Sequence, residues 1–123
     1  MAAAIANLKI LQAEKLAERA AAMEKILLPA LERIQKRHAK DLGCLRGRGL
    51  VAGIQVVKPG TREPDSAMAT KINLACFHKG LLMFAPVGIA GECLKIAPPL
   101  TIPEDALRES LAVFEEACNE VLG

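Results

Sequence analysis

The chain has 123 residues, a formal net charge of +2 and 52% hydrophobic residues, but only three Phe and no Tyr or Trp. This length suits one domain, and its core must be aliphatic because aromatic side chains are so few. The near-balanced charge gives no electrostatic basis for binding nucleic acid or an anionic membrane, so we expect neither partner. No stretch has transmembrane length and the N-terminus lacks the basic start of a signal peptide, so we expect a cytoplasmic protein.

Residue types that often bind metals or form disulfides are scattered here. No two cysteines form a CxxC pair and each lies in an apolar stretch, so we expect small buried thiols rather than disulfides or zinc ligands. The two histidines lie near the ends of different predicted helices, beside Arg or Lys, and we expect them to be solvated. The residues concerned are Cys44, Cys76, Cys93, Cys118, His38 and His78.

The first third of the chain is predicted to be helical. A short Ala-rich helix comes first, and a longer apolar stripe at helical spacing follows it. The basic residues at 36–40 suit a helix C-terminus. Pro29 lies inside the pattern and is expected to kink or split the helix, because it removes a backbone donor. The stripe consists of Leu16, Ala20, Met23, Leu27, Leu31 and Ile34.

The rest of the chain alternates strands and helices. The RGRG stretch at 46–49 is expected to be a turn with two exposed arginines that opens a strand, rather than a nucleic-acid motif. The predicted elements are a strand at 50–57, a helix from Asp65 or Ser66 to Gly80, strands at 81–87 and 93–99, and a last helix from Pro103. Three strands need a helical layer on at least one face. The predicted fold class is therefore α/β, a small two-layer sandwich with a sheet of about three strands covered by helices, preceded by a long N-terminal helical segment.

Lys95 lies in the middle of a short apolar strand. Strand alternation places Leu94 and Ile96 on one face, and Cys93, Lys95 and Ala97 on the other. Spacing alone makes Lys95 an ordinary residue on the second, solvated face.

Three stretches carry a resemblance to a known family. The chain contains LRGRGLVAGIQVVKP at 45–59, KINLACFHKGLLMFAPVG at 71–88 and CLKIAPPLTIPEDALRESLAVFEEA at 93–117. In order and spacing they resemble the C-terminal part of class III aminotransferases. These are fold type I pyridoxal-phosphate enzymes that include 4-aminobutyrate, ornithine and acetylornithine aminotransferases and dialkylglycine decarboxylase.

The resemblance implies a division of the chain and a function. Residues 1–13 would be a helix from the junction with a large domain, and residues 14–123 the C-terminal small domain. The parent enzyme would move an amino group between an amino donor and an oxo acid, and would be a homo-oligomer. The catalytic lysine and the pyridoxal-phosphate site lie in the large domain of such enzymes, upstream of these residues. We therefore expect no catalytic, cofactor-binding or metal-binding residue here, no cofactor on this chain alone, and no activity without the large domain.

One position carries a role over from the family. Lys95 stands where many members have an Arg that grips the substrate carboxylate, so the resemblance implies that Lys95 faces the active-site side and binds a substrate anion. Lys offers a point charge where Arg offers a planar bidentate grip. Some relatives that act as lyases on phosphorylated amino alcohols also hold Lys here. A phospholyase or decarboxylase parent, or a non-catalytic interaction module, remain the alternatives.

Overall fold

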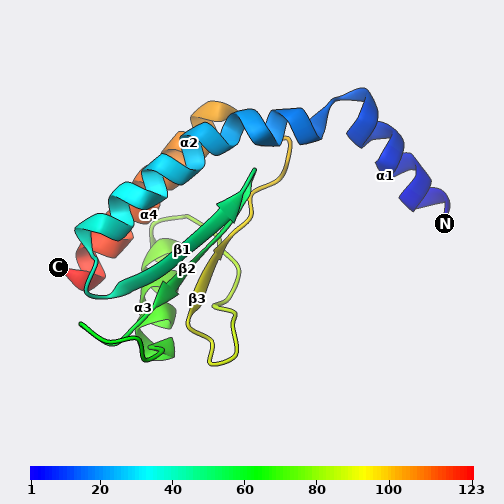
Figure 1. The fold of residues 1–123 in the computed structure, drawn as a ribbon. Coiled ribbons are helices and arrows are strands. Elements are labelled where there is room, and N and C mark those ends of the chain that lie inside the picture. The colour runs from blue at the N-terminus through cyan, green and yellow to red at the C-terminus, as the bar shows by residue number, and fades with distance from the viewer.

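The computed structural model describes all 123 residues and contains four helices and three strands (Figure 1). No helix is both long enough and apolar enough to cross a membrane. The elements, in chain order, are α1 (Ala2–Ala13), α2 (Leu16–Arg37), β1 (Leu42–Arg48), β2 (Val51–Val56), α3 (Ser66–His78), β3 (Cys93–Ile96) and α4 (Glu104–Leu122).

The three strands form one antiparallel sheet in the order β1-β2-β3. Ile54 at the centre of β2 lies opposite Leu45 of β1 and Leu94 of β3. The pairing of β1 is irregular between Leu42 and Leu45, where the register shifts. Gly49 makes the tight turn into β2 with a φ of 60°, a left-handed conformation that glycine adopts without strain.

One face of the sheet carries the helical layer. Helices α2, α3 and α4 lie on the same side, whereas the opposite face has no helix over it (Figure 1). The core between the layers is aliphatic, as the composition predicts, with Phe114 as its one buried aromatic ring. Its fully buried side chains include Leu27, Leu31, Ile34, Ile54, Ile72, Leu94 and Cys118. The two-layer α/β sandwich is therefore confirmed.

Two strand predictions were wrong in detail. RGRG is not a turn that precedes a strand; its first three residues, 46–48, complete β1, and the turn follows at Gly49 and Leu50. Residues 81–87 are extended but form no strand, because they pair with the sheet through a single bridge from Val87 to Cys93. The sheet still has three strands, since β1 takes the place of the expected strand at 81–87.

The long helix is not split at Pro29, the residue predicted to kink or split it. Pro29 neither ends nor splits α2, which runs unbroken from Leu16 to Arg37. Pro29 is exposed, so the carbonyl group that it leaves unpaired can reach water. Lys15, with a left-handed φ of 50°, separates α1 from α2, in agreement with the short helix predicted ahead of the long one.

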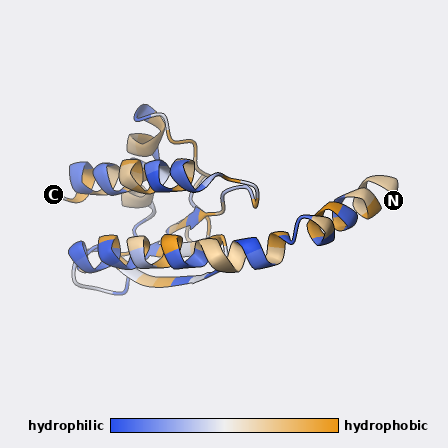
Figure 2. Ribbon diagram, turned by 90° about the horizontal axis from the view of Figure 1, so that it is seen from above, coloured by the Kyte–Doolittle hydropathy of each residue, from blue (hydrophilic) through white to orange (hydrophobic).

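Helix α1 extends away from the rest of the molecule (Figures 1 and 2). None of its residues is buried, although apolar residues are distributed along it (Figure 2). Ile5 is 50% exposed and Leu8 is 60% exposed. A helix with apolar residues that no neighbour covers normally packs against further protein.

His38 was expected to be solvated, and this was wrong. It follows the last residue of α2 but is only 5% exposed, because its Nε2 atom forms a 2.9 Å hydrogen bond with Oδ1 of Asn119 on α4. His78 is exposed, as predicted. His38 thus joins the ends of two helices that are distant in the sequence.

We predict that His38→Ala lowers the free energy of unfolding by about 1–3 kcal/mol, because it removes a buried side chain and its hydrogen bond. The matched control is His78→Ala, which should change that free energy by less than about 0.5 kcal/mol. Urea unfolding followed by circular dichroism measures both variants. Equal effects would contradict the structural role of His38.

The cysteines differ in burial: Cys76 and Cys118 are buried, Cys93 is half-buried and Cys44 is exposed. Burial raises the pKa of Cys76 to about 11 and that of Cys118 to about 12, as expected for core thiols. Cys44 is exposed, contrary to the expectation that all four are buried, because the irregular pairing of β1 places it on the helix-free side of the sheet.

We predict that Cys44 reacts first with an aromatic disulfide reagent at pH 8, while Cys76 and Cys118 react only after unfolding. Their raised pKa values leave about one thiol in a thousand or fewer ionised at that pH, and the reactive species is the thiolate. Mass spectrometry of peptides from native and urea-treated protein gives the order of labelling. Rapid labelling of Cys118 in the native protein would show that the core opens readily.

Candidate anion-binding site

The alternation of β3 determines where Lys95 points. Leu94 has no exposed surface and lies in the core, and Ile96 packs against the same core. Lys95 therefore projects from the opposite, helix-free face, and is half-buried there. The side of the sheet predicted for Lys95 from strand spacing is thus the one observed.

Lys95 belongs to a row that runs across all three strands. It lies opposite Gly53 of β2, and Gly53 lies opposite Arg46 of β1. Because glycine has no side chain, the middle of the row is open between the two cations. A Cβ atom at Gly53 would come within 3.0 Å of the Cys93 sulfur, so a larger residue here would crowd this face.

The row forms part of a shallow hollow of about 400 Å³ over the sheet. Three cations line it, Arg46, Arg48 and Lys95, together with apolar residues and no acidic side chain. None of these cations takes part in any of the ion pairs of the molecule. Unpaired positive charge of this density attracts anions.

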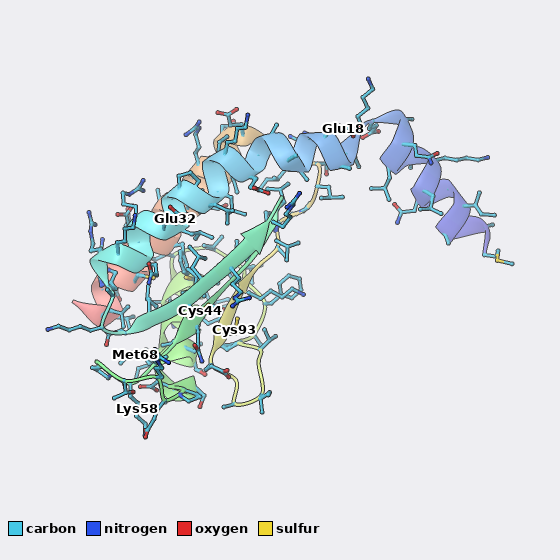
Figure 3. The ribbon with its side chains drawn as sticks, viewed as in Figure 1. Glu18, Glu32, Cys44, Lys58, Met68 and Cys93 are labelled. Atoms are coloured by element: carbon cyan, nitrogen blue, oxygen red, sulfur yellow. The ribbon has the colours of Figure 1, made fainter.

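Cys93 lines the hollow, and Cys44 lies near it on β1. Figure 3 shows Cys44 on β1 and Cys93 at the start of β3, close to each other in the view onto this face. Interaction with the Cys44 side chain raises the pKa of Arg46, whose guanidinium is charged in any case. Burial, and then the charges of Glu92 and Cys44, raise the pKa of the Cys93 thiol. The Cys93 thiol is therefore uncharged where it lines the hollow.

An aromatic ring positions the Lys95 ammonium group. The Nζ atom lies 4.7 Å from the centre of the Phe84 ring, a cation–π contact. Such a contact orients the ammonium without neutralising it, unlike a carboxylate partner. The group remains available to an anion.

The end of β3 is anchored to α2. The Arg19 guanidinium donates hydrogen bonds to the carbonyl oxygens of Leu100, at 2.6 Å, and Ile102. The intervening prolines at 98 and 99 restrict the backbone between this anchor and the strand. The anchor and the prolines together hold the strand that carries Lys95.

Sequence reasoning found Lys95 but not its neighbours. The sequence predicts Arg46 and Arg48 as exposed turn residues, whereas the pairing of β1 with β2 puts them on the face of Lys95. Phe84 was placed in a strand with no assigned contact. One feature of the sequence could have indicated that Arg46 and Arg48 belong to a strand. The Gly-Leu pair that follows RGR is compatible with the two-residue turn of a β-hairpin.

Comparisons with known proteins agree with this fold. The sequence pattern of the class III aminotransferases matches residues 1–118. The chain is 32% identical to a 4-aminobutyrate aminotransferase of Mycobacterium leprae over 97% of its own length and 26% of the relative's. It is 36% identical to an isoleucine 2-epimerase of Lentilactobacillus buchneri over 98% of its length and 26% of that protein.

A solved structure is also similar. A phospholyase from Arthrobacter, in complex with phosphoethanolamine, superposes with a TM-score of 0.84 at 28% identity, covering 94% of this chain and 27% of that one. The chain thus spans about a quarter of the length of the relatives it matches. With its family pattern matched over nearly every residue, the chain belongs to the class III aminotransferases.

Proposed function

We propose that residues 14–123 form the C-terminal small domain of a pyridoxal-phosphate-dependent class III aminotransferase, with residues 1–13 as the helix that joins it to a large domain. The parent enzyme transfers an amino group between an amino donor and an oxo acid. Lys95 binds an anionic group of the substrate. The observation that carries this proposal is the unpaired Lys95 on a sheet face that has cations, no acid and no covering helix.

Class III aminotransferases depend on pyridoxal phosphate, and this chain does not fit that cofactor by itself. The hollow around Lys95 offers cations for a phosphate but no carboxylate to pair with the ring nitrogen. The cofactor site therefore belongs to the large domain in this proposal. The role of the present residues is to bind and orient the anionic end of the substrate.

A phospholyase parent is the second candidate. Three cations in one hollow suit a doubly charged phosphate, and lysine at position 95 gives a point charge rather than a bidentate carboxylate grip. The similar phospholyase structure contains phosphoethanolamine, a phosphorylated amine. Both candidates give Lys95 the same task and differ in the anion.

The proposal also assigns partners and a compartment. The uncovered helix α1 packs on the large domain, and the parent is a cytoplasmic homo-oligomer. The exposed apolar side chains of α1 support a covered position in the complete enzyme.

In the complete enzyme that contains this domain, Lys95→Ala should weaken the binding of the substrate anion by about 1.5–3 kcal/mol, the value of a hydrogen bond to a charged group. The expected result is a rise in KM of about 10- to 150-fold. Lys95→Arg should retain or improve binding of a carboxylate substrate. Steady-state kinetics with carboxylate and with phosphate substrates separates the two candidates. A rise in the KM for the carboxylate favours the aminotransferase, and a rise in the KM for the phosphate favours the phospholyase.

The matched control for Lys95→Ala is Lys71→Ala, which removes an exposed lysine on α3 and should leave KM unchanged. Unchanged kinetics of Lys95→Ala with every anionic substrate would refute the role of Lys95.

We also predict that this chain alone does not bind pyridoxal phosphate at one specific lysine. After incubation with the cofactor and borohydride reduction, peptide mapping should find only weak, scattered labelling of its nine lysines. A complete class III aminotransferase, treated identically, serves as the positive control. Stoichiometric labelling of one lysine together with amino transfer would contradict the placement of the cofactor site in a large domain.

A further inference from the structure

A second hollow lies beside Lys95, between the segment 81–84, the end of β3 and α4. It is a cavity of about 530 Å³, within the range of small-molecule sites. Lys95 and Ser110 are its only polar side chains. Apolar residues that form its walls include Leu82, Phe84, Ile96, Pro99, Leu111 and Phe114.

The cavity exists because a segment separates from the sheet. Val87 and Cys93 exchange two backbone hydrogen bonds of 2.8 Å, as in an antiparallel pair. Continuing this register would place Ala85 opposite Lys95, yet residues 82–86 form no backbone hydrogen bond with β3. The space that the ladder would have closed is thereby left open.

The chemistry of the walls selects the occupant. The Ser110 hydroxyl already donates a 2.8 Å hydrogen bond to the Ala106 carbonyl, so it is satisfied within its own helix. The only charge is the ammonium of Lys95, which lies over Phe84 at the boundary between this cavity and the cationic hollow. A polar tail would leave unpaired groups against these walls, whereas an apolar tail would not.

We infer that the cavity takes the apolar tail of an organic anion whose charged head pairs with Lys95. This inference rests on the proposed role of Lys95 as the anion contact and adds the tail site, so the substrate class is an acid with an aliphatic or aromatic chain. Phe84 is 53% exposed and belongs to the segment without ladder hydrogen bonds, so the ring can move to admit the tail.

The test is a titration of the 123-residue chain with hexanoate, followed by amide chemical shifts in NMR spectra. Acetate has the head without the tail, and hexan-1-ol has the tail without the charge. Hexanoate should bind with a Kd about tenfold or more below that of acetate, since each buried methylene adds affinity. Hexan-1-ol should also bind more weakly than hexanoate, and the shifts should map to 82–85 and to α4 near Ser110.

Four variants test the contact of the charged head and the contact of the apolar tail separately. Lys95→Gln should weaken hexanoate binding about tenfold or more, and Lys71→Gln, the matched control, should not. Ser110→Leu and Ala97→Leu fill the cavity from two walls and should lower hexanoate affinity to that of acetate. Dispersed amide spectra show that each variant is folded, and either filling variant suffices if the other unfolds.

Two outcomes would overturn the inference in different ways. If hexanoate and acetate bind equally well and both require Lys95, the tail site is refuted while the anion contact stands. If hexanoate binding is indifferent to Lys95→Gln, the anion contact is refuted, and if its shifts map to α1, both the tail site and the anion contact are refuted in this chain.

Discussion

The two-residue period of β3 is the constraint on which the site depends. Leu94 is fully buried against the helical layer, and burying such a side chain stabilises a fold by about 1.5–3 kcal/mol. A slip of one residue would expose Leu94 and move the Lys95 ammonium into the core, where an unpaired charge is far more costly. The position of Lys95 is thus imposed by its apolar neighbour, and not by its own contact with Phe84. Arg19 and the prolines at 98 and 99 then hold the strand end in that register.

The helical layer was largely predictable from the sequence because its information is local. The apolar stripe of α2 recurs at helical spacing, and five of its six predicted residues are buried. Errors arose where tertiary context decides. An exposed proline was compatible with a continuous α2, and a long-range partner on α4 buried His38. Strand β1 was not predicted, since its sequence LGCLRGR has two glycines, two arginines and no β-branched residue.

The candidate site was predictable only at its centre. Alternation around Leu94 was enough to place Lys95 on the second face, and this needs only three consecutive residues. The other cations of the hollow could not be assigned, because the face of Arg46 and Arg48 follows from the register between β1 and β2. The cavity beyond Phe84 depends on a strand that fails to form, although its residues have the composition of a strand. Both features depend on the pairing of segments that are distant in the sequence, which a short stretch of sequence does not reveal.

The separated segment has a consequence for how such a domain can change over evolutionary time. Residues 82–86 contribute no ladder hydrogen bonds, and Leu82 and Phe84 are largely exposed, so substitutions there disturb little of what keeps the chain folded. The same residues shape one wall of the cavity, whereas β3 and its lysine are committed to the core register. In the proposed site, ligand preference can therefore change through substitutions in this segment while Lys95 stays in place. A scaffold divided in this way separates the residues under selection for folding from those free to acquire new specificities.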